Sequence, residues 1–165
     1  SSGAQPLAAL AEARILAQQA RADETLMLVA RGDSAGYEKS FADTTATLND
    51  RLGSVSGAAA APAASVAAQG WIAAHKRVST ANQSGDYPAA VALAVGAGRQ
   101  DSAAQFTALD DALRDGISTT RQVLQDKASS AQSALSGLSP GVLVLCLLAA
   151  AAAAAGMWPR LREFQ

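Results

Sequence analysis

The chain of 165 residues has one cysteine and one histidine, which removes several kinds of chemistry at once. Because Cys146 has no second cysteine, the chain can form neither an internal disulfide nor a thiolate metal site. His75 has no second histidine and no nearby cysteine, so a metal site or a nucleophilic triad lacks its partners. We expect a surface or half-buried histidine, no catalytic residues, no metal and no cofactor. The sequence therefore predicts a protein that is not an enzyme.

Aromatic residues are also scarce, at 4% of the chain, although half of all residues are hydrophobic. Most of the hydrophobic residues are alanines, which have the highest helix propensity. The β-branched and aromatic residues that mark strands do not alternate over a useful length. These features predict an all-α protein whose core depends on close helix packing.

The chain has no excess of basic residues, since it contains 13 lysines and arginines and 14 aspartates and glutamates. Proteins that bind a phosphate backbone usually carry a clear positive footprint. Nucleic acid is therefore not an expected partner.

An apolar stretch without charge, from Gly141 to Trp158, contains five leucines and valines, then Leu148 and seven consecutive alanines. With the three residues before it, this stretch reaches the length of about 20 residues that a membrane-spanning helix needs. Trp158 stands at its end, and Arg160 and Arg162 follow, as expected at a cytoplasmic membrane interface. We predict an extracytoplasmic domain at residues 1–138, a transmembrane helix at 139–158 and a cytoplasmic tail at 159–165.

An export signal does not open the chain, which begins with small and polar residues. An extracytoplasmic domain needs such a signal or an earlier membrane helix. We therefore expect that this sequence belongs to a longer protein. The cell membrane is the predicted location.

All five prolines, including Pro140 and Pro159, are expected at helix ends. Together with the glycines they divide residues 1–138 into four long helical patterns. Their expected extents are about 6–31, 34–55, 63–82 and 106–138, and a short helix capped by Asp86 is expected before Gly96. A long apolar stripe in the last pattern is typical of a bundle packed at a shallow angle. We predict an antiparallel up-down four-helix bundle with a short extra helix between helices 3 and 4, continuing into the transmembrane helix beyond Ser139, Pro140 and Gly141.

Spacings of three and four residues predict which face of each helix is buried. The expected buried residues are Ala8, Ala11, Ile15, Ala22, Leu26 and Val29 in the first helix, then Tyr37, Phe41, Thr45, Leu48, Leu52 and Val55 in the second. In the third they are Ala67, Trp71, Ala74, Val78 and Ala81, and in the fourth Phe106, Leu109, Leu113, Ile117, Thr120, Leu124, Ala128, Ala131, Leu135 and Leu138.

One set of polar residues suggests a ligand. Arg14, Gln18 and Arg21 share a face of the first helix, where two guanidinium groups could hold a carboxylate. The plainer interpretation is solvated charge, with Arg21 paired to Glu24 three residues on. The fourth helix offers Thr119, Thr120 and Arg121 as further candidates, and its cluster Asp110, Asp111 and Asp115 is interpreted as a solvated acidic face.

Three segments, residues 10–32, 71–78 and 85–96, resemble parts of actinobacterial multi-pass membrane proteins with extracytoplasmic helical domains. That family is similar to chemoreceptor-type four-helix-bundle sensors. The resemblance implies a membrane component that links an amino-acid solute-binding protein outside the cell to a Ser/Thr kinase pathway inside. It carries over no binding residue.

Three functions stay open at this point. The first is a sensor or adaptor module that docks a solute-binding protein or small ligand and passes a displacement of the last helix to the membrane. The second is a direct amino-acid receptor, expected as a homodimer, that uses Arg14 and Arg21. The third is a structural envelope scaffold that binds partners without ligand dependence.

Overall fold

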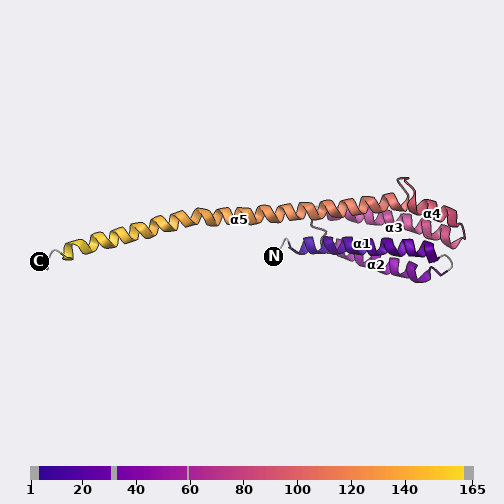
Figure 1. Cartoon of the computed structure of the whole chain (residues 1–165), viewed down its shortest axis with the longest axis horizontal. Coiled ribbons are helices and arrows are strands. Elements are labelled where there is room, and N and C mark those ends of the chain that lie inside the picture. The colour runs from indigo at the N-terminus through magenta and orange to yellow at the C-terminus, as the bar shows by residue number, and fades with distance from the viewer. Residues whose placement is uncertain (1–3, 31–32, 59, 162–165) are drawn as a thin grey trace. The chain divides into compact units, whose positions relative to one another are not determined.

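The computed structural model describes residues 4–30, 33–58 and 60–161, with side chains to residue 133. It contains α1 (Ala4–Ala30), α2 (Ala35–Ser54), α3 (Ala61–Gln83), α4 (Tyr87–Val95) and α5 (Ser102–Leu161) (Figure 1). The described residues include no strand, so the prediction of an all-α protein is confirmed.

Local sequence signals explain the connection between α3 and α4. Gly85 has a φ of 83°, in the left-handed region that a residue without a Cβ adopts most easily. Asp86 then caps α4, because its carboxylate accepts a hydrogen bond of 3.1 Å from the amide of Ala89. Pro88 lies in the first turn of α4, where its missing N–H costs least. The short extra helix was therefore predicted correctly.

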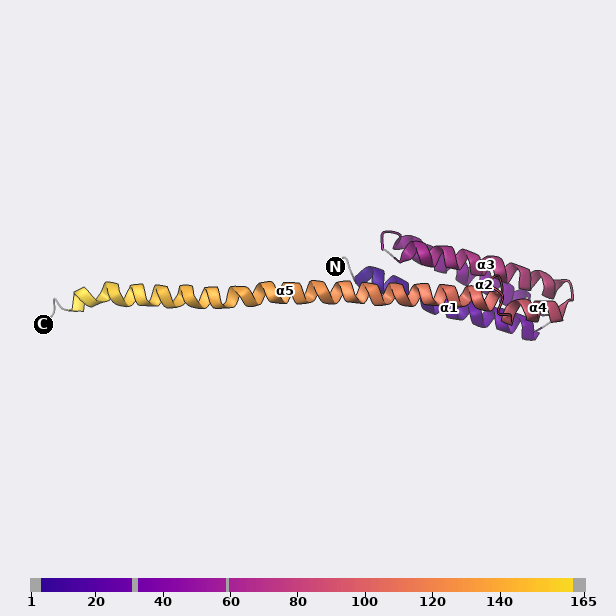
Figure 2. The same cartoon turned by 90° about the horizontal axis from the view of Figure 1, so that it is seen from above.

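The chain divides into two compact units, residues 1–122 and 123–165. In the first unit α1, α2, α3 and the beginning of α5 lie side by side as a helical bundle (Figures 1 and 2). The main core takes residues from all four helices, led by Leu10, Leu48, Trp71 and Leu113. A smaller core, with Met27, Val78 and Ala90 at its centre, joins α1, α3 and α4.

Glycine and alanine allow α5 to approach both α1 and the beginning of α3 closely. A Cβ added at Gly116 of α5 would lie 2.7 Å from the Cβ of Ala60 and 3.4 Å from a methyl carbon of Leu10. A larger side chain at this position would force the helices apart. The small residues thus replace the bulky side chains that the sequence lacks.

Most predicted helix faces are confirmed. Phe41, Thr45, Leu48 and Leu52 of α2 and Val55 just after it are buried, as are Trp71, Ala74 and Val78 of α3 and Leu109 and Leu113 of α5. In these helices Tyr37, Ala67, Ala81, Phe106, Ile117, Thr120 and Leu124 are half-buried, and Ala128 and Ala131 are exposed. Leu135 and Leu138 lie outside the residues whose side chains are described.

The predicted buried face of α1 is wrong. Ile15, Leu26 and Val29 are 59%, 44% and 69% exposed, Ala8 and Ala22 are also exposed, and Ala11 is half-buried. The buried residues are instead Leu10, Ala13, Ala17, Ala20, Glu24, Met27 and Leu28. Apolar residues occur on two faces of this helix, and the face that packs inward carries the small alanines and Glu24.

The predicted break at Ser139, Pro140 and Gly141 is also wrong, because α5 continues through these residues to Leu161 and includes Pro159. A proline inside a helix costs about 3 kcal/mol, largely through one lost hydrogen bond. Long runs of helix-forming residues on both sides, including seven alanines, offset this local cost.

In the part of the chain that the structure describes, no helix has a stretch both long and apolar enough to cross a membrane. The predicted transmembrane segment, 139–158, and the predicted tail, 159–165, lie outside the residues whose side chains are described.

The two faces of α1 can be distinguished by paired substitutions. We expect Leu10→Ala to lower the free energy of unfolding by about 2 to 5 kcal/mol, because it leaves a cavity in the main core. Ile15→Ala should change it by less than about 0.5 kcal/mol, because the side chain is already exposed. Urea denaturation of the whole chain, followed by circular dichroism, measures both. Equal losses would contradict the burial of the Leu10 face.

Candidate functional site

A charged side chain is buried inside the bundle. Glu24 of α1 is 1% exposed, and an unpaired carboxylate at such a position would be strongly unfavourable. Three side chains compensate it: Arg21 forms an ion pair with Oε2, His75 Nδ1 lies 3.2 Å from Oε1, and Ser102 Oγ lies 2.6 Å from the same oxygen. We call Glu24, Arg21, His75 and Ser102 the buried polar network.

Ser102, the first residue of α5, uses all its hydrogen-bonding capacity in this network. Its hydroxyl donates to Glu24 at 2.6 and 2.8 Å. The same oxygen accepts hydrogen bonds from Trp71 Nε1 at 3.0 Å and from Arg21 Nη1 at 3.2 Å. One side chain thereby fixes the beginning of α5 to both α1 and α3.

Arg21 extends the network to α4. Its Nη2 donates to the carbonyl oxygen of Ala94 at 3.3 Å, near the end of that helix. Its guanidinium carbon lies 5.5 Å from the centre of the Phe106 ring, within the range of a cation–π interaction. The plainer prediction for Arg21, a pair with Glu24, is confirmed, although this pair is not on the surface.

His75 lies between two carboxylates. Its Nε2 is 3.4 Å from Glu38 Oε2 of α2, and its ring stacks on Phe41 with centroids 3.5 Å apart. A neutral imidazole can donate to only one of Glu24 and Glu38, whereas an imidazolium donates to both. The two ring nitrogens therefore provide a path by which a change of charge at Glu38 reaches Glu24.

The prediction of a surface or half-buried histidine is wrong, because His75 is buried, with only 5% of its surface exposed. Its neighbours Lys76 and Arg77 are exposed, and their charges suggested that His75 was exposed as well. The signal that could have located it is its spacing of four residues from the buried Trp71, which puts both side chains on one face of α3.

The order of groups differs from that of a nucleophilic triad. In a triad the histidine contacts the hydroxyl and the carboxylate supports the histidine. Here Glu24 lies between His75 and Ser102 and binds both. The arrangement suits holding charge and linking helices better than activating a hydroxyl.

Opposing effects act on the pKa of Glu24. Burial alone would raise it, but the hydrogen bonds from His75 and Ser102 and the positive charge of Arg21 outweigh burial and lower it below its ordinary value of 4.5. The folded protein therefore favours the ionised carboxylate.

A second polar contact joins α1 to α5. Arg14 Nε lies 2.7 Å from Asp110 Oδ1 and its Nη2 lies 3.3 Å from Oδ2, while Gln18 Nε2 also reaches Oδ1 at 3.3 Å. The hydrogen bond from Arg14 is the largest influence on the pKa of Asp110 and lowers it. The prediction that Asp110 belongs to a solvated acidic face is wrong, because its side chain is only 16% exposed and binds Arg14. Asp111 and Asp115 are exposed, as predicted.

The predicted ligand residues fall into two groups. Arg14, Gln18 and Arg21 do share the side of α1 that meets α5, but both guanidiniums already bind carboxylates of the chain. Thr119 and Arg121 are exposed, and half-buried Thr120 donates to the carbonyl of Gly116. The structure thus brings together the first three residues and leaves Thr119, Thr120 and Arg121 farther along α5.

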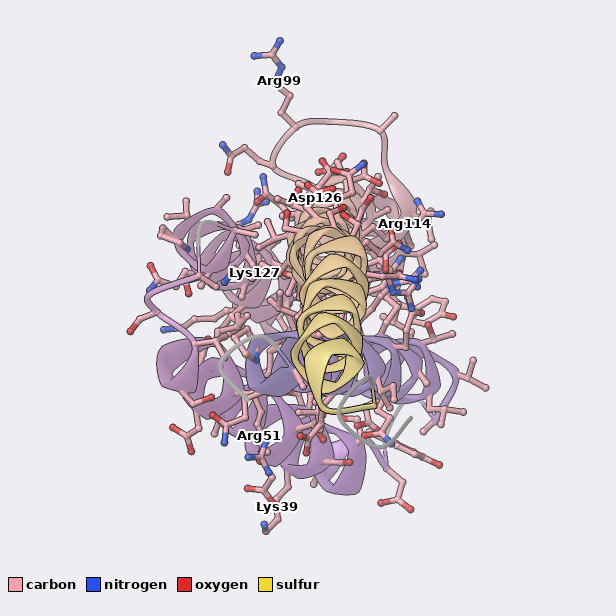
Figure 3. All side chains as sticks on the ribbon, turned by 90° about the vertical axis from the view of Figure 1, so that its left-hand side faces the viewer. Lys39, Arg51, Arg99, Arg114, Asp126 and Lys127 are labelled. Atoms are coloured by element: carbon pink, nitrogen blue, oxygen red, sulfur yellow. The ribbon has the colours of Figure 1, made fainter. Side chains whose placement is uncertain are left out.

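A groove between α2 and α3 lies beside the network. It has a volume of about 360 Å³, and its lining includes Glu38, Phe41, Thr45, Ile72, His75 and Lys76. Other charged side chains, such as Lys39 of α2 and Arg99 before α5, point away from the helices (Figure 3). Through Glu38 and His75, which line it, the groove gives solvent access to groups that contact the buried Glu24.

Among the residues that the structure describes, no cluster of three histidine, cysteine, aspartate or glutamate side chains could hold a metal ion. No family model, curated protein or solved structure matches the chain. The resemblance to the actinobacterial membrane proteins therefore stays a prediction, and the geometry alone supports the function argued below.

Glu24 should make the stability of the protein sensitive to acid. Because its pKa is lowered by folding, its contribution is fully present above about pH 4.5 and is lost as the pH falls through the folded-state pKa. Glu24→Gln should lower the free energy of unfolding by about 3 kcal/mol at pH 7, because it leaves Arg21 and His75 without their anion. The difference from the unchanged protein should shrink towards pH 3.

Urea denaturation between pH 3 and pH 7 measures this difference. Glu12→Gln is the matched control, because Glu12 lies on the same helix but is 48% exposed in its pair with Arg51. The control should differ from the unchanged protein by less than about 0.5 kcal/mol at every pH. A loss for Glu24→Gln that does not vary with pH would contradict the assignment.

Proposed function

We propose that the chain is the extracytoplasmic sensor or adaptor module of a membrane signalling protein. Residues 1–138 would form an antiparallel up-down four-helix bundle with α4 at one end, residues 139–158 a transmembrane helix, and residues 159–165 a cytoplasmic tail. Binding of a solute-binding protein or small ligand to the bundle would be relayed across the membrane through α5.

The observation that carries this proposal is the attachment of Ser102. The first residue of α5 is bound to Glu24, Trp71 and Arg21, so the beginning of this helix depends on the state of α1 and α3. The helix that begins there is continuous to Leu161 and includes the long uncharged stretch. A change in the network therefore has a direct route into the predicted membrane segment.

The register of contacts supports an antiparallel arrangement of α1 and α5. Ser102 contacts Glu24, Asp110 contacts Arg14, and Gly116 lies against Leu10. Residue numbers rise along α5 as they fall along α1, which is the pairing expected of neighbouring helices that run in opposite directions.

The occupied guanidiniums favour an adaptor, or a ligand bound elsewhere, over direct reception at Arg14 and Arg21. A ligand carboxylate at these positions would have to displace Asp110 or Glu24. Displacing Glu24 would leave a buried anion without its partners, at a cost of several kcal/mol.

Membrane topology can be tested by labelling single cysteines. In the native membrane protein, Cys146→Ser removes the one natural cysteine, and Ser84→Cys or Gln165→Cys adds one on either side of the predicted span. An impermeant maleimide should label Ser84→Cys on intact cells, but Gln165→Cys only after permeabilisation. Labelling of both positions on intact cells, or of neither, would contradict the proposed topology.

The relay can be tested by hydrogen–deuterium exchange. Glu24→Gln should speed amide exchange by about tenfold or more in residues 102–109, which depend on the network, and much less in residues 45–54 of α2. Glu12→Gln serves as the control and should alter neither segment. An equal increase in both segments would indicate general destabilisation and would exclude a specific link from Glu24 to α5.

A further inference from the structure

The groove between α2 and α3 contains an incompletely satisfied anion. Glu38 Oε2 faces His75, but Glu38 Oε1 is buried and has no hydrogen-bond partner among the described residues. Buried carboxylate oxygens are rarely left without a donor, because each has lost its contact with water. Glu38 therefore indicates where a donor from outside the chain would be favourable.

The charges around Glu38 define which donor fits. Glu24 already has Arg21 as a permanent counter-ion. Among the described residues, the Glu38 carboxylate contacts one basic side chain, His75 at 3.4 Å, and His75 also contacts Glu24. A ligand that brings both a positive charge and N–H bonds would complete this site, since charge-assisted hydrogen bonds are the stronger kind.

The remaining walls limit the size and character of the ligand. The groove volume of about 360 Å³ lies near the lower end of the range for small-molecule sites. Phe41 and Ile72 provide apolar contacts, and Lys76, also in the lining, forms no ion pair with the described residues. A short apolar body therefore fits beside the charged group, and Lys76 is free to meet a carboxylate.

We propose that this groove binds a small organic molecule with a primary ammonium group, which donates to Glu38 Oε1. The site would serve an alkylamine or a small apolar amino acid, which share this group. Binding in the groove does not depend on the proposed sensor function, but its role in signalling does. Because His75 contacts both Glu38 and Glu24, an occupied groove would alter the network that holds Ser102.

Isothermal titration calorimetry of the full chain tests the site with butylamine and leucine as probes and butanol as the uncharged comparison. At least one of the two ammonium probes should bind, and butanol should not. Glu38→Gln should weaken that binding at least about tenfold, because it removes the charge while preserving the shape. Asp43→Asn is the matched control, since it removes one charge from the same helix outside the groove, and should leave binding unchanged.

Lys76→Ala distinguishes the two sources of the ammonium group. Weaker leucine binding with unchanged butylamine binding would assign the site to amino acids, and binding of butylamine alone would assign it to amines. Absence of binding by both probes, or equal binding to Glu38→Gln at an unchanged melting temperature, would overturn the proposal. The labelling and exchange experiments use no ligand, so failure of the groove and failure of the relay are separate results.

Discussion

Burial of the Glu24 carboxylate is the constraint on which this bundle depends. A charge at 1% exposure must be paired, and its partners come from α1, α3 and α5. Alanine surfaces pack with little preference for one register, because small side chains offer few distinct contacts. Fixed polar contacts at Glu24 and Asp110 favour one register between α1 and α5. The choice of arrangement between these helices therefore comes from the polar contacts.

Three of the seven aromatic side chains lie near this carboxylate. Phe41, Trp71 and Phe106 form a continuous set of edge contacts with centroids 5.1 Å apart, and His75 stacks on Phe41. They shield the ion pairs from water, which strengthens each electrostatic interaction. On the side of the groove this apolar cover ends at Glu38, whose side chain is 25% exposed. Glu38 contacts His75, and His75 contacts the buried carboxylate of Glu24. This access to the buried network is what the proposed sensing function would use.

The helices and most of their buried faces could be predicted from the sequence, because they depend on local properties. Each of α2, α3 and the bundle part of α5 has one dominant apolar stripe, and Asp86 caps α4 as expected. The face of α1 could not be predicted, since the stripe with Ile15 and Val29 satisfies the same periodicity as the stripe with Leu10 and Met27. The sequence also implied a break at Pro140, where the surrounding helix prevailed.

The sequence by itself determined the all-helical class, the scarcity of bulky core residues and the shared face of Arg14, Gln18 and Arg21, because helix propensity and helical spacing act over a few residues. Only the tertiary structure decided what that face contacts. His75 and Ser102 lie 51 and 78 residues from Glu24, and their meeting depends on which helices become neighbours and in which register. Buried ion pairs of this kind leave little local signal, because the sequence spacing of the partners carries no information about their distance in space.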